Sequence, residues 1–185
     1  AVLNRVNVDP EKIALGDSKG KTCATTLTLT NHYNYDVTYD VSFVDALATG
    51  PEIFTPSFAT DTANVKFSQK VVKVRHHDNA FVRVTITPDP TLDDKSLYGG
   101  YIVFTPRSGG QTLRVPVAGF KGDYQSIQAL APTAYGFPWL ASLINGNYVQ
   151  QSDNTVYTLQ NGDIPYFLFH LDQGVQVFQV EVIDA

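Results

Sequence analysis

One short segment has the residue types of a hydrolase or phosphate-binding site. Residues 16–20 read Gly-Asp-Ser-Lys-Gly, which places a serine between glycines as in a nucleophile elbow. The serine of such an elbow needs a strand that turns sharply into a helix, with a histidine and an acid beside it. The stretch 16–22 also resembles a phosphate loop, but it is one residue short and has no helix to follow it. The next residues alternate like a strand, so we interpret the segment as a surface turn.

A second segment, His76-His77-Asp78, contains groups that could bind a metal ion. Adjacent residues of an extended chain point to opposite sides, so the two imidazoles cannot easily share one ion. No cysteine or further histidine lies close by in sequence, and His32 and His170 are isolated. We therefore predict a solvated turn at residues 76–79.

Asp89, Asp93 and Asp94 form an acidic loop with carboxylates that could bind calcium. Their spacing differs from that of the Asp-x-Asp-x-Asp-Gly calcium loop, so we interpret the loop as solvated and leave calcium binding in residues 89–94 open. The single cysteine, Cys23, lies in an alternating strand pattern and is predicted to be a small buried residue rather than a nucleophile. We accordingly assign no catalytic, cofactor-binding or metal-binding residue to this chain.

Aromatic residues gather in two places and could form a sugar-binding face. The first group is Tyr33, Tyr35 and Tyr39, and the second is Tyr135, Phe137 and Trp139. In a β-sandwich most such side chains pack in the core or against a neighbouring domain. Core packing is our interpretation, and sugar binding is the alternative.

Charge and hydropathy exclude several classes of partner. The 185 residues carry a net charge of −5, and no basic stripe exists that could bind nucleic acid. No apolar run approaches the roughly 18 residues of a membrane span. The chain has no methionine and begins with alanine, so we expect a processed chain or a piece of a longer protein.

The elements that would position these residues are strands. Alternating apolar positions, frequent Val, Tyr and Phe, and turn residues between the runs predict about seven short strands over residues 1–122. The first two runs are predicted to form an antiparallel hairpin, the last two a second one, and Asp45–Asn64 a long connection. The fold class is therefore all-β, an immunoglobulin-like or fibronectin-III-like sandwich. Six of these runs are Lys21–Thr30, Tyr35–Val44, Gln69–Arg75, Ala80–Thr87, Leu97–Thr105 and Thr112–Val117, and residues 2–15 are interpreted as a short extended lead-in. Val82, Val84 and Ile86 are predicted to form the buried face of their run.

The pattern changes after Tyr124. Three later runs are predicted as strands: Thr155–Leu159, Ile164–Leu171 and Val175–Ile183. These are too few to close a second sandwich. We predict a complete module at residues 1–124 and, at 125–185, the start of a second, truncated β-domain or a β-extension of the first.

Two segments resemble a known family. Residues 98–104 read Tyr-Gly-Gly-Tyr-Ile-Val-Phe, and residues 113–124 read Leu-Arg-Val-Pro-Val-Ala-Gly-Phe-Lys-Gly-Asp-Tyr. They resemble the end of the fibronectin-III-like domain that follows the catalytic domain in secreted bacterial subtilisin-like serine proteases (subtilases). Val117 departs from the tyrosine usual there. Glycines here suit close backbone approach and turns, and Pro116 would need an edge or a bulge.

The resemblance extends to other parts of the chain. Residues 26–31 with 37–42 are similar to the first hairpin of that domain, and residues 131–140 and 165–172 to the opening of the next β-domain in bacterial members. Together the matching segments span most of residues 21–185. The subtilase motifs Asp-Ser/Thr-Gly, His-Gly-Thr-His and Gly-Thr-Ser-Met-Ala do not occur in this chain.

The resemblance implies a function without catalysis. It implies an accessory module, extracellular or cell-wall associated, that braces or spaces the catalytic domain of the protease and shapes substrate access. That catalytic domain would precede residue 1 and would be the intramolecular partner, with protein substrates or cell-wall components as further candidates. The alternative from a different class is a cell-surface adhesion or carbohydrate-binding sandwich.

Overall fold

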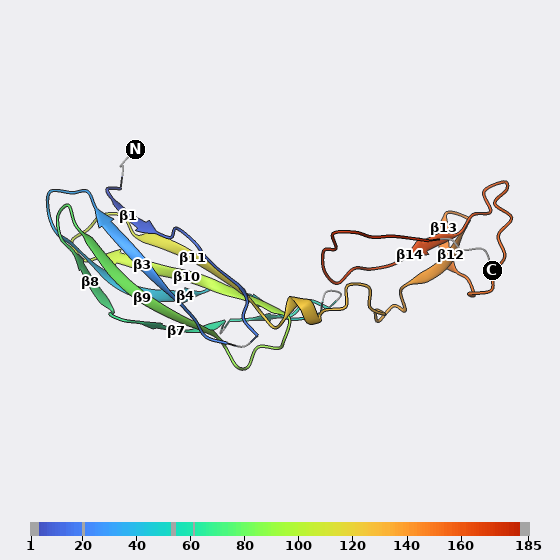
Figure 1. Ribbon diagram of the computed structural model, residues 1–185, viewed down its shortest axis with the longest axis horizontal. Coiled ribbons are helices and arrows are strands. Elements are labelled where there is room, and N and C mark those ends of the chain that lie inside the picture. Colours follow the sequence, from blue (N-terminus) through green and yellow to red (C-terminus); the bar gives the residue numbers. More distant parts are fainter. Residues whose placement is uncertain (1–3, 20, 53–54, 61, 182–185) are drawn as a thin grey trace. The chain divides into compact units, whose positions relative to one another are not determined.

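The computed structural model describes residues 4–19, 21–52, 55–60 and 62–181. The chain divides into two compact units, Ala1–Tyr124 and Gln125–Ala185 (Figure 1). No helix in the described part of the chain is long and apolar enough to cross a membrane.

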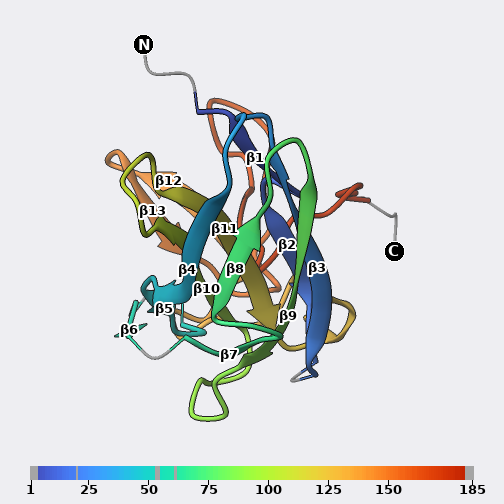
Figure 2. The same ribbon diagram turned by 90° about the vertical axis from the view of Figure 1, so that its left-hand side faces the viewer.

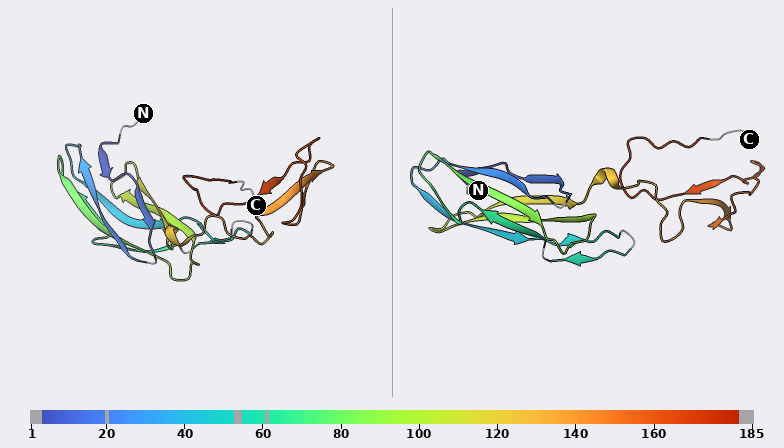
Figure 3. Two further views of the ribbon diagram at one scale, coloured as in Figure 1. Left: turned by 45° about the vertical axis from the view of Figure 1, so that its right-hand side comes forward. Right: turned by 60° about the horizontal axis from the view of Figure 1, so that its bottom comes forward.

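The first unit is a β-sandwich of two sheets, which Figures 2 and 3 show from further sides. The smaller sheet is antiparallel and contains, in spatial order, β1 (Val6–Asp9), β3 (Cys23–Asn31), β9 (Asn79–Pro88) and β7 (Ala63–Phe67). The larger sheet contains β2 (Ile13–Asp17), β11 (Leu113–Lys121), β10 (Ser96–Pro106), β4 (Val37–Asp45) and β8 (Val71–Val74). Two short strands extend it beside β10, namely β5 (Ala48–Thr49) and β6 (Phe58–Ala59). The predicted all-β sandwich is confirmed.

The core lies between the two sheets. Strand β3 contributes Leu27 and Leu29, and the facing strand β10 contributes Ile102 and Phe104, all four with no exposed surface. The ring of Phe104 meets that of Tyr39 edge-on, with 6.3 Å between their centroids. Burying an aliphatic or aromatic side chain of this size contributes roughly 1.5–3 kcal/mol. The buried faces predicted by alternation are therefore confirmed for β3, β4 and β9.

The predicted pairing of the first two runs is wrong. Strand β3 pairs with β1 and β9, whereas β4 pairs with β10 and β8 in the other sheet. The turn between β3 and β4 therefore crosses from one sheet to the other. Period-two alternation identifies the buried face of a strand but says nothing about which strand lies beside it. The second predicted pair is confirmed, because β10 and β11 are antiparallel neighbours.

The number of strands was also underestimated. The first unit has eleven strands, β1 to β11, within its described residues. The extra ones are short: β1 and β2 lie in the stretch interpreted as an extended lead-in, and β5, β6 and β7 in or beside the predicted connection 45–64. Strands of two to five residues leave too few alternating positions to be recognised.

The second unit contains one three-stranded sheet, and a 3₁₀ turn begins at Tyr124. The order is β13 (Asn147–Gln150), β12 (Trp139–Ile144) and β14 (Tyr166–Leu168). The β12–β13 hairpin was not predicted, although Asn145-Gly146, both with positive φ, is the usual two-residue hairpin turn. Ala141 is the only hydrophobic residue that is buried in the described part of this unit.

Two strands predicted in the second unit are wrong. Residues 155–159 are not a strand, and neither are 175–181; residues 182 and 183 lie outside the described residues. Val156 is 87% exposed and Val177 78% exposed, so the alternating apolar residues have no sheet to cover them. Of the run 164–171, only β14 is a strand.

Candidate functional sites

The serine of residues 16–20 is a structural residue. Ser18 is nearly buried, and both its N–H and its hydroxyl donate to the carbonyl oxygen of Phe120, at 2.9 and 3.0 Å. It follows β2 and precedes β3, so the strand-to-helix turn of a nucleophile elbow is not present here. Gly20 lies outside the described residues. These hydrogen bonds tie the β2–β3 turn to the end of β11.

The histidine pair lies in the turn between β8 and β9. The rings of His76 and His77 are 6.3 Å apart and nearly perpendicular, and His76 Nδ1 lies 3.0 Å from Asp36 Oδ1. Lys73, whose ammonium is 2.9 Å from the Asp36 carboxylate, together with the N–H and ring of His76, lowers the pKa of Asp36. Within the described residues, no three His, Cys, Asp or Glu side chains converge as metal ligands.

The acidic loop closes around a lysine. Asp89 accepts hydrogen bonds from the N–H and hydroxyl of Thr91, and these bonds lower the pKa of its carboxyl group. The Lys121 ammonium donates to the loop carbonyl oxygens of Asp89, Pro90 and Leu92. Carbonyl oxygens that could have coordinated a cation are thus already bound to the protein's own cation.

The two segments that resemble the subtilase module are adjacent in space. In the β10–β11 pair, Tyr98 lies opposite Gly119, Gly99 opposite Ala118 and Tyr101 opposite Pro116. A Cβ atom on Gly99 would lie 2.2 Å from the carbonyl oxygen of Val117. The predicted need for glycine at a close backbone approach is confirmed there. Pro116 pairs on the β10 side, while the β2 pairing begins one residue later, at Val117, which explains how the sheet accommodates a proline.

The outer surface of this strand pair is apolar. We call the side chains of Val44, Leu47, Leu97 and Tyr101 the β10 patch; their exposed fractions are 52, 62, 52 and 42%. Val44 and Tyr101 are direct neighbours across β4 and β10. Beside them a shallow hollow is lined by residues 46–47, Thr49, 97–101 and 116–118, none of which has a charged side chain. Such surfaces commonly mark sites of protein contact.

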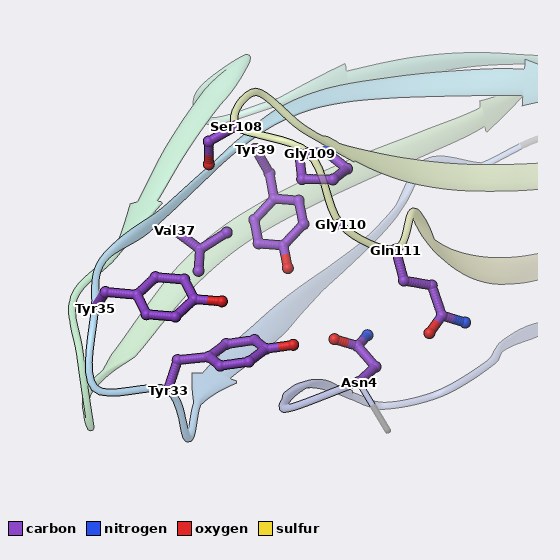
Figure 4. A pocket seen from close by; sticks show the side chains of 10 residues that line it. Asn4, Tyr33, Tyr35, Val37, Tyr39, Ser108, Gly109, Gly110 and Gln111 are labelled. Carbon is purple, nitrogen blue, oxygen red and sulfur yellow. The ribbon is translucent and has the colours of Figure 1, made fainter. Parts of the chain in front are cut away.

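A second hollow lies at the far end of β10, and we call it the tyrosine pocket. The rings of Tyr33 and Tyr35 are stacked, with centroids 4.7 Å apart and planes 24° apart. Figure 4 shows the hydroxyl ends of Tyr33, Tyr35 and Tyr39 and the carboxamide of Asn4 directed into one space, with Gln111 at its side. The full lining is Asn4, Tyr33, Tyr35, Val37, Tyr39, Pro106, Ser108, Gly109, Gly110 and Gln111.

The linings of the two hollows do not include Tyr135, Phe137, Trp139 or Cys23. Phe137 and Trp139 pack against each other at 4.8 Å between centroids, and Tyr135 is 59% exposed. Cys23 is half-buried rather than buried, because it lies at the first position of β3. Tyr39 is 2% exposed and packs in the core as expected, whereas Tyr35 is 54% exposed.

The two packed sheets define a β-sandwich module of the immunoglobulin and fibronectin-III type. The chain belongs to the Fn3-like domain family, whose model matches residues 13–118. Domains of this kind are typically non-catalytic. No curated protein matches the chain.

Parts of this chain are similar to parts of solved structures, among them the following three, each with a TM-score below 0.5. A PapD-like domain of human CEP192 has 21% identity and a TM-score of 0.49, with 63% of this chain and 84% of that chain covered. A FixG-related protein from Vibrio parahaemolyticus has 10% identity and a TM-score of 0.44, covering 64% and 98%. The CsuC–CsuE chaperone–adhesin complex of Acinetobacter baumannii has 15% identity and a TM-score of 0.42, covering 77% and 74%.

Proposed function

We propose that this chain is a non-catalytic accessory module of an extracellular or cell-wall-associated subtilisin-like serine endopeptidase. It braces the catalytic domain of that protease through the β10 patch. The observation that carries the proposal is the position of the motif residues. The segments that resemble the subtilase module, 98–104 and 113–124, are paired strands, and both contribute residues to one uncharged hollow.

The chemistry of the β10 patch suits a neighbouring protein domain. Tyr101 and Leu97 lie on the outer side of β10. Gly99 lies between them and has no side chain, so the surface is recessed at that position. Aromatic side chains surrounded by uncharged residues are typical of the centre of a protein interface. Because the lining has no charged group, a docked domain would leave no unpaired charge buried.

The first experiment is to sequence the gene upstream of the codon for Ala1. We expect the same reading frame to encode a domain with the Gly-Thr-Ser-Met-Ala motif of subtilases. An upstream frame that encodes no protease domain would overturn the protease context and leave the Fn3-like assignment intact.

The second experiment tests bracing in the protein that contains both the protease domain and this module, which we call the joined protein. Tyr101→Asp introduces a charge into the β10 patch and should shorten the half-life of protease activity at elevated temperature by about tenfold, equivalent to about 1.4 kcal/mol. The matched control is Phe81→Asp on the other sheet, at a side chain that is 60% exposed. Equal half-lives for the two variants would refute docking through this patch.

A third experiment addresses catalysis by the module itself. The purified chain should not cleave casein or peptide substrates. Any proteolysis that is sensitive to serine-protease inhibitors would overturn the proposal, and a Ser18→Ala variant would show whether Ser18 or another residue is the nucleophile.

A further inference from the structure

We propose that the tyrosine pocket binds a neutral saccharide. This inference goes beyond the accessory role, because the pocket is separated from the β10 patch along β10. Leu97 lies near one end of that strand and Pro106 at the other. At about 3.3 Å per residue, these two residues are roughly 30 Å apart. Tyr101, the patch residue nearest the pocket along β10, is roughly 17 Å from Pro106, so a small ligand can bind in the pocket while the patch is in contact with another domain.

The pocket is built from groups that both donate and accept hydrogen bonds. Three phenol hydroxyls and the carboxamide of Asn4 point into it (Figure 4), and Gln111 lines its side. Each phenol can donate one hydrogen bond and accept others, and each carboxamide has an acceptor oxygen and a donor NH₂. Saccharide hydroxyl groups have this same dual character. The phenols and carboxamides of the pocket can therefore match saccharide hydroxyl groups at several points.

The charge of the lining limits the ligand class. None of the ten lining residues, all within the described chain, has an acidic, basic or histidine side chain. An anionic ligand such as a phosphate would find no cation to neutralise it, and a cationic ligand would find no carboxylate. The hydroxyl ends of the rings, rather than their faces, are directed into the space, which is unlike the aromatic cage that binds quaternary ammonium groups. A neutral, hydroxyl-rich ligand fits both observations.

The aromatic rings also offer an apolar surface. Tyr35 is 54% exposed and is backed by Tyr33, so the stacked pair forms a supported platform at the mouth of the pocket. The apolar C–H groups of a neighbouring sugar unit outside the pocket can pack on the exposed part of Tyr35, while the hydroxyl groups of the unit inside the pocket meet the phenol hydroxyls.

The platform is held in place before any ligand binds. Asn31, which has no exposed surface, accepts a hydrogen bond from the N–H of Tyr33 and donates one to the carbonyl oxygen of Tyr35. The ring of Tyr39 is held on its core side by its edge-on contact with the ring of Phe104. A preformed site loses less conformational entropy on binding.

The test uses the purified chain and a defined set of probes. These are neutral gluco-, manno- and galacto-oligosaccharides and oligomers of N-acetylglucosamine, screened on an array and measured by titration calorimetry. We expect saturable binding of at least one probe. Tyr35→Ala and Gln111→Ala should each weaken it by tenfold or more. Tyr101→Ala, at an exposed tyrosine in the β10 patch, should leave it unchanged.

Three outcomes would overturn the proposal: no saccharide binding at millimolar concentrations, equal weakening by Tyr35→Ala and Tyr101→Ala, or binding of a proline-rich peptide in place of saccharides.

Tyr35 is exposed, so the Tyr35→Ala variant should fold, and circular dichroism checks this. Tyr33→Phe keeps the stacked ring and removes only the hydroxyl. Full affinity in both Tyr33→Phe and Gln111→Ala would contradict hydrogen-bonded recognition. Failure of saccharide binding leaves the bracing experiment on the joined protein unaffected.

Discussion

The Asn31 side chain donates a hydrogen bond to the backbone carbonyl of Tyr35 across a distance of 2.9 Å. Its second N–H donates to the carbonyl of Val74 in the opposite sheet, at 3.1 Å, and its oxygen accepts from the N–H of Tyr33. One buried amide thus satisfies three backbone groups and joins β3, β8 and the turn between β3 and β4 that contains Tyr33 and Tyr35. Because the Asn31 side chain and its bond to Val74 are fully buried, and the other two bonds are partly buried, these backbone groups would be costly to leave without partners.

Replacing this amide should destabilise the fold. Asn31→Ala is expected to lower the free energy of unfolding by about 2–4 kcal/mol, because it leaves up to three backbone groups without partners. Urea unfolding followed by circular dichroism measures the loss. Asn64→Ala, at an exposed amide on β7, should change stability by less than about 0.5 kcal/mol. Comparable losses in both variants would contradict this role for Asn31.

Gly99 should not tolerate a side chain. A Cβ there would lie 2.2 Å from Val117 O and 3.2 Å from Ala118 Cα, so β10 and β11 would have to separate. We expect Gly99→Ala to lower the unfolding free energy by about 1–3 kcal/mol in urea titrations. Gly174→Ala is the control, since a Cβ at that position meets no atom within 4 Å. If Gly99→Ala is as stable as the native chain, β10 and β11 can move apart at this point without loss of stability, and the prediction is wrong.

Lys121 should hold the acidic loop without calcium. Lys121→Met removes the donor to three loop carbonyl groups and should lower the unfolding free energy by about 1–3 kcal/mol. Thermal unfolding with and without calcium provides the measurement, and Lys70→Met, at an exposed lysine, is the control. We expect calcium to have no effect on the native chain. Calcium-dependent stabilisation of the native chain would overturn this interpretation of the loop.

Tyr39 should make the fold sensitive to alkaline pH. Burial, and then the neighbouring phenols of Tyr33 and Tyr35, raise the pKa of Tyr39 to about 12. An unfolded tyrosine has a pKa of about 10, so between these values the folded chain keeps a proton that the unfolded chain has lost. Stability is unaffected below this window and falls as pH rises through it, by about 1.4 kcal/mol per unit.

The variant Tyr39→Phe isolates this contribution. Its unfolding free energy should fall less steeply than that of the native chain between pH 10 and 12, as measured by urea unfolding across that range. Tyr101→Phe, at an exposed tyrosine, should keep the native slope. Parallel curves for the native chain and Tyr39→Phe would exclude Tyr39 as the group responsible.

The first unit should fold by itself. The buried core cluster lies entirely within residues 6–117, whereas the described part of the second unit buries only Ala141 among its hydrophobic residues. A chain of residues 1–124 should therefore unfold cooperatively, with a midpoint temperature within a few degrees of that of the 185-residue chain. Loss of cooperative unfolding on truncation would show that residues 125–185 complete the core.

Local patterns in the sequence were enough to identify the long strands of the first unit and the buried faces of β3, β4 and β9. Val82, Val84 and Ile86 alternate, and they are buried in β9 as predicted. The glycines of residues 98–124 likewise indicated close backbone contact, which Gly99 confirms. In the second unit the same reasoning failed at residues 155–159 and 175–181, because alternation implies a strand only where a neighbouring strand and a core exist to receive it.

The sequence by itself determined an all-β sandwich of the Fn3-like kind and the faces its strands bury, because alternation is a property of adjacent residues. Only the tertiary structure decided that β3 and β4 lie in opposite sheets, and that Lys121 occupies the acidic loop. It alone brought Asn4 and Gln111 beside three tyrosines. These relationships join residues far apart in the chain, and strand pairing and packing, which no local pattern encodes, bring them together.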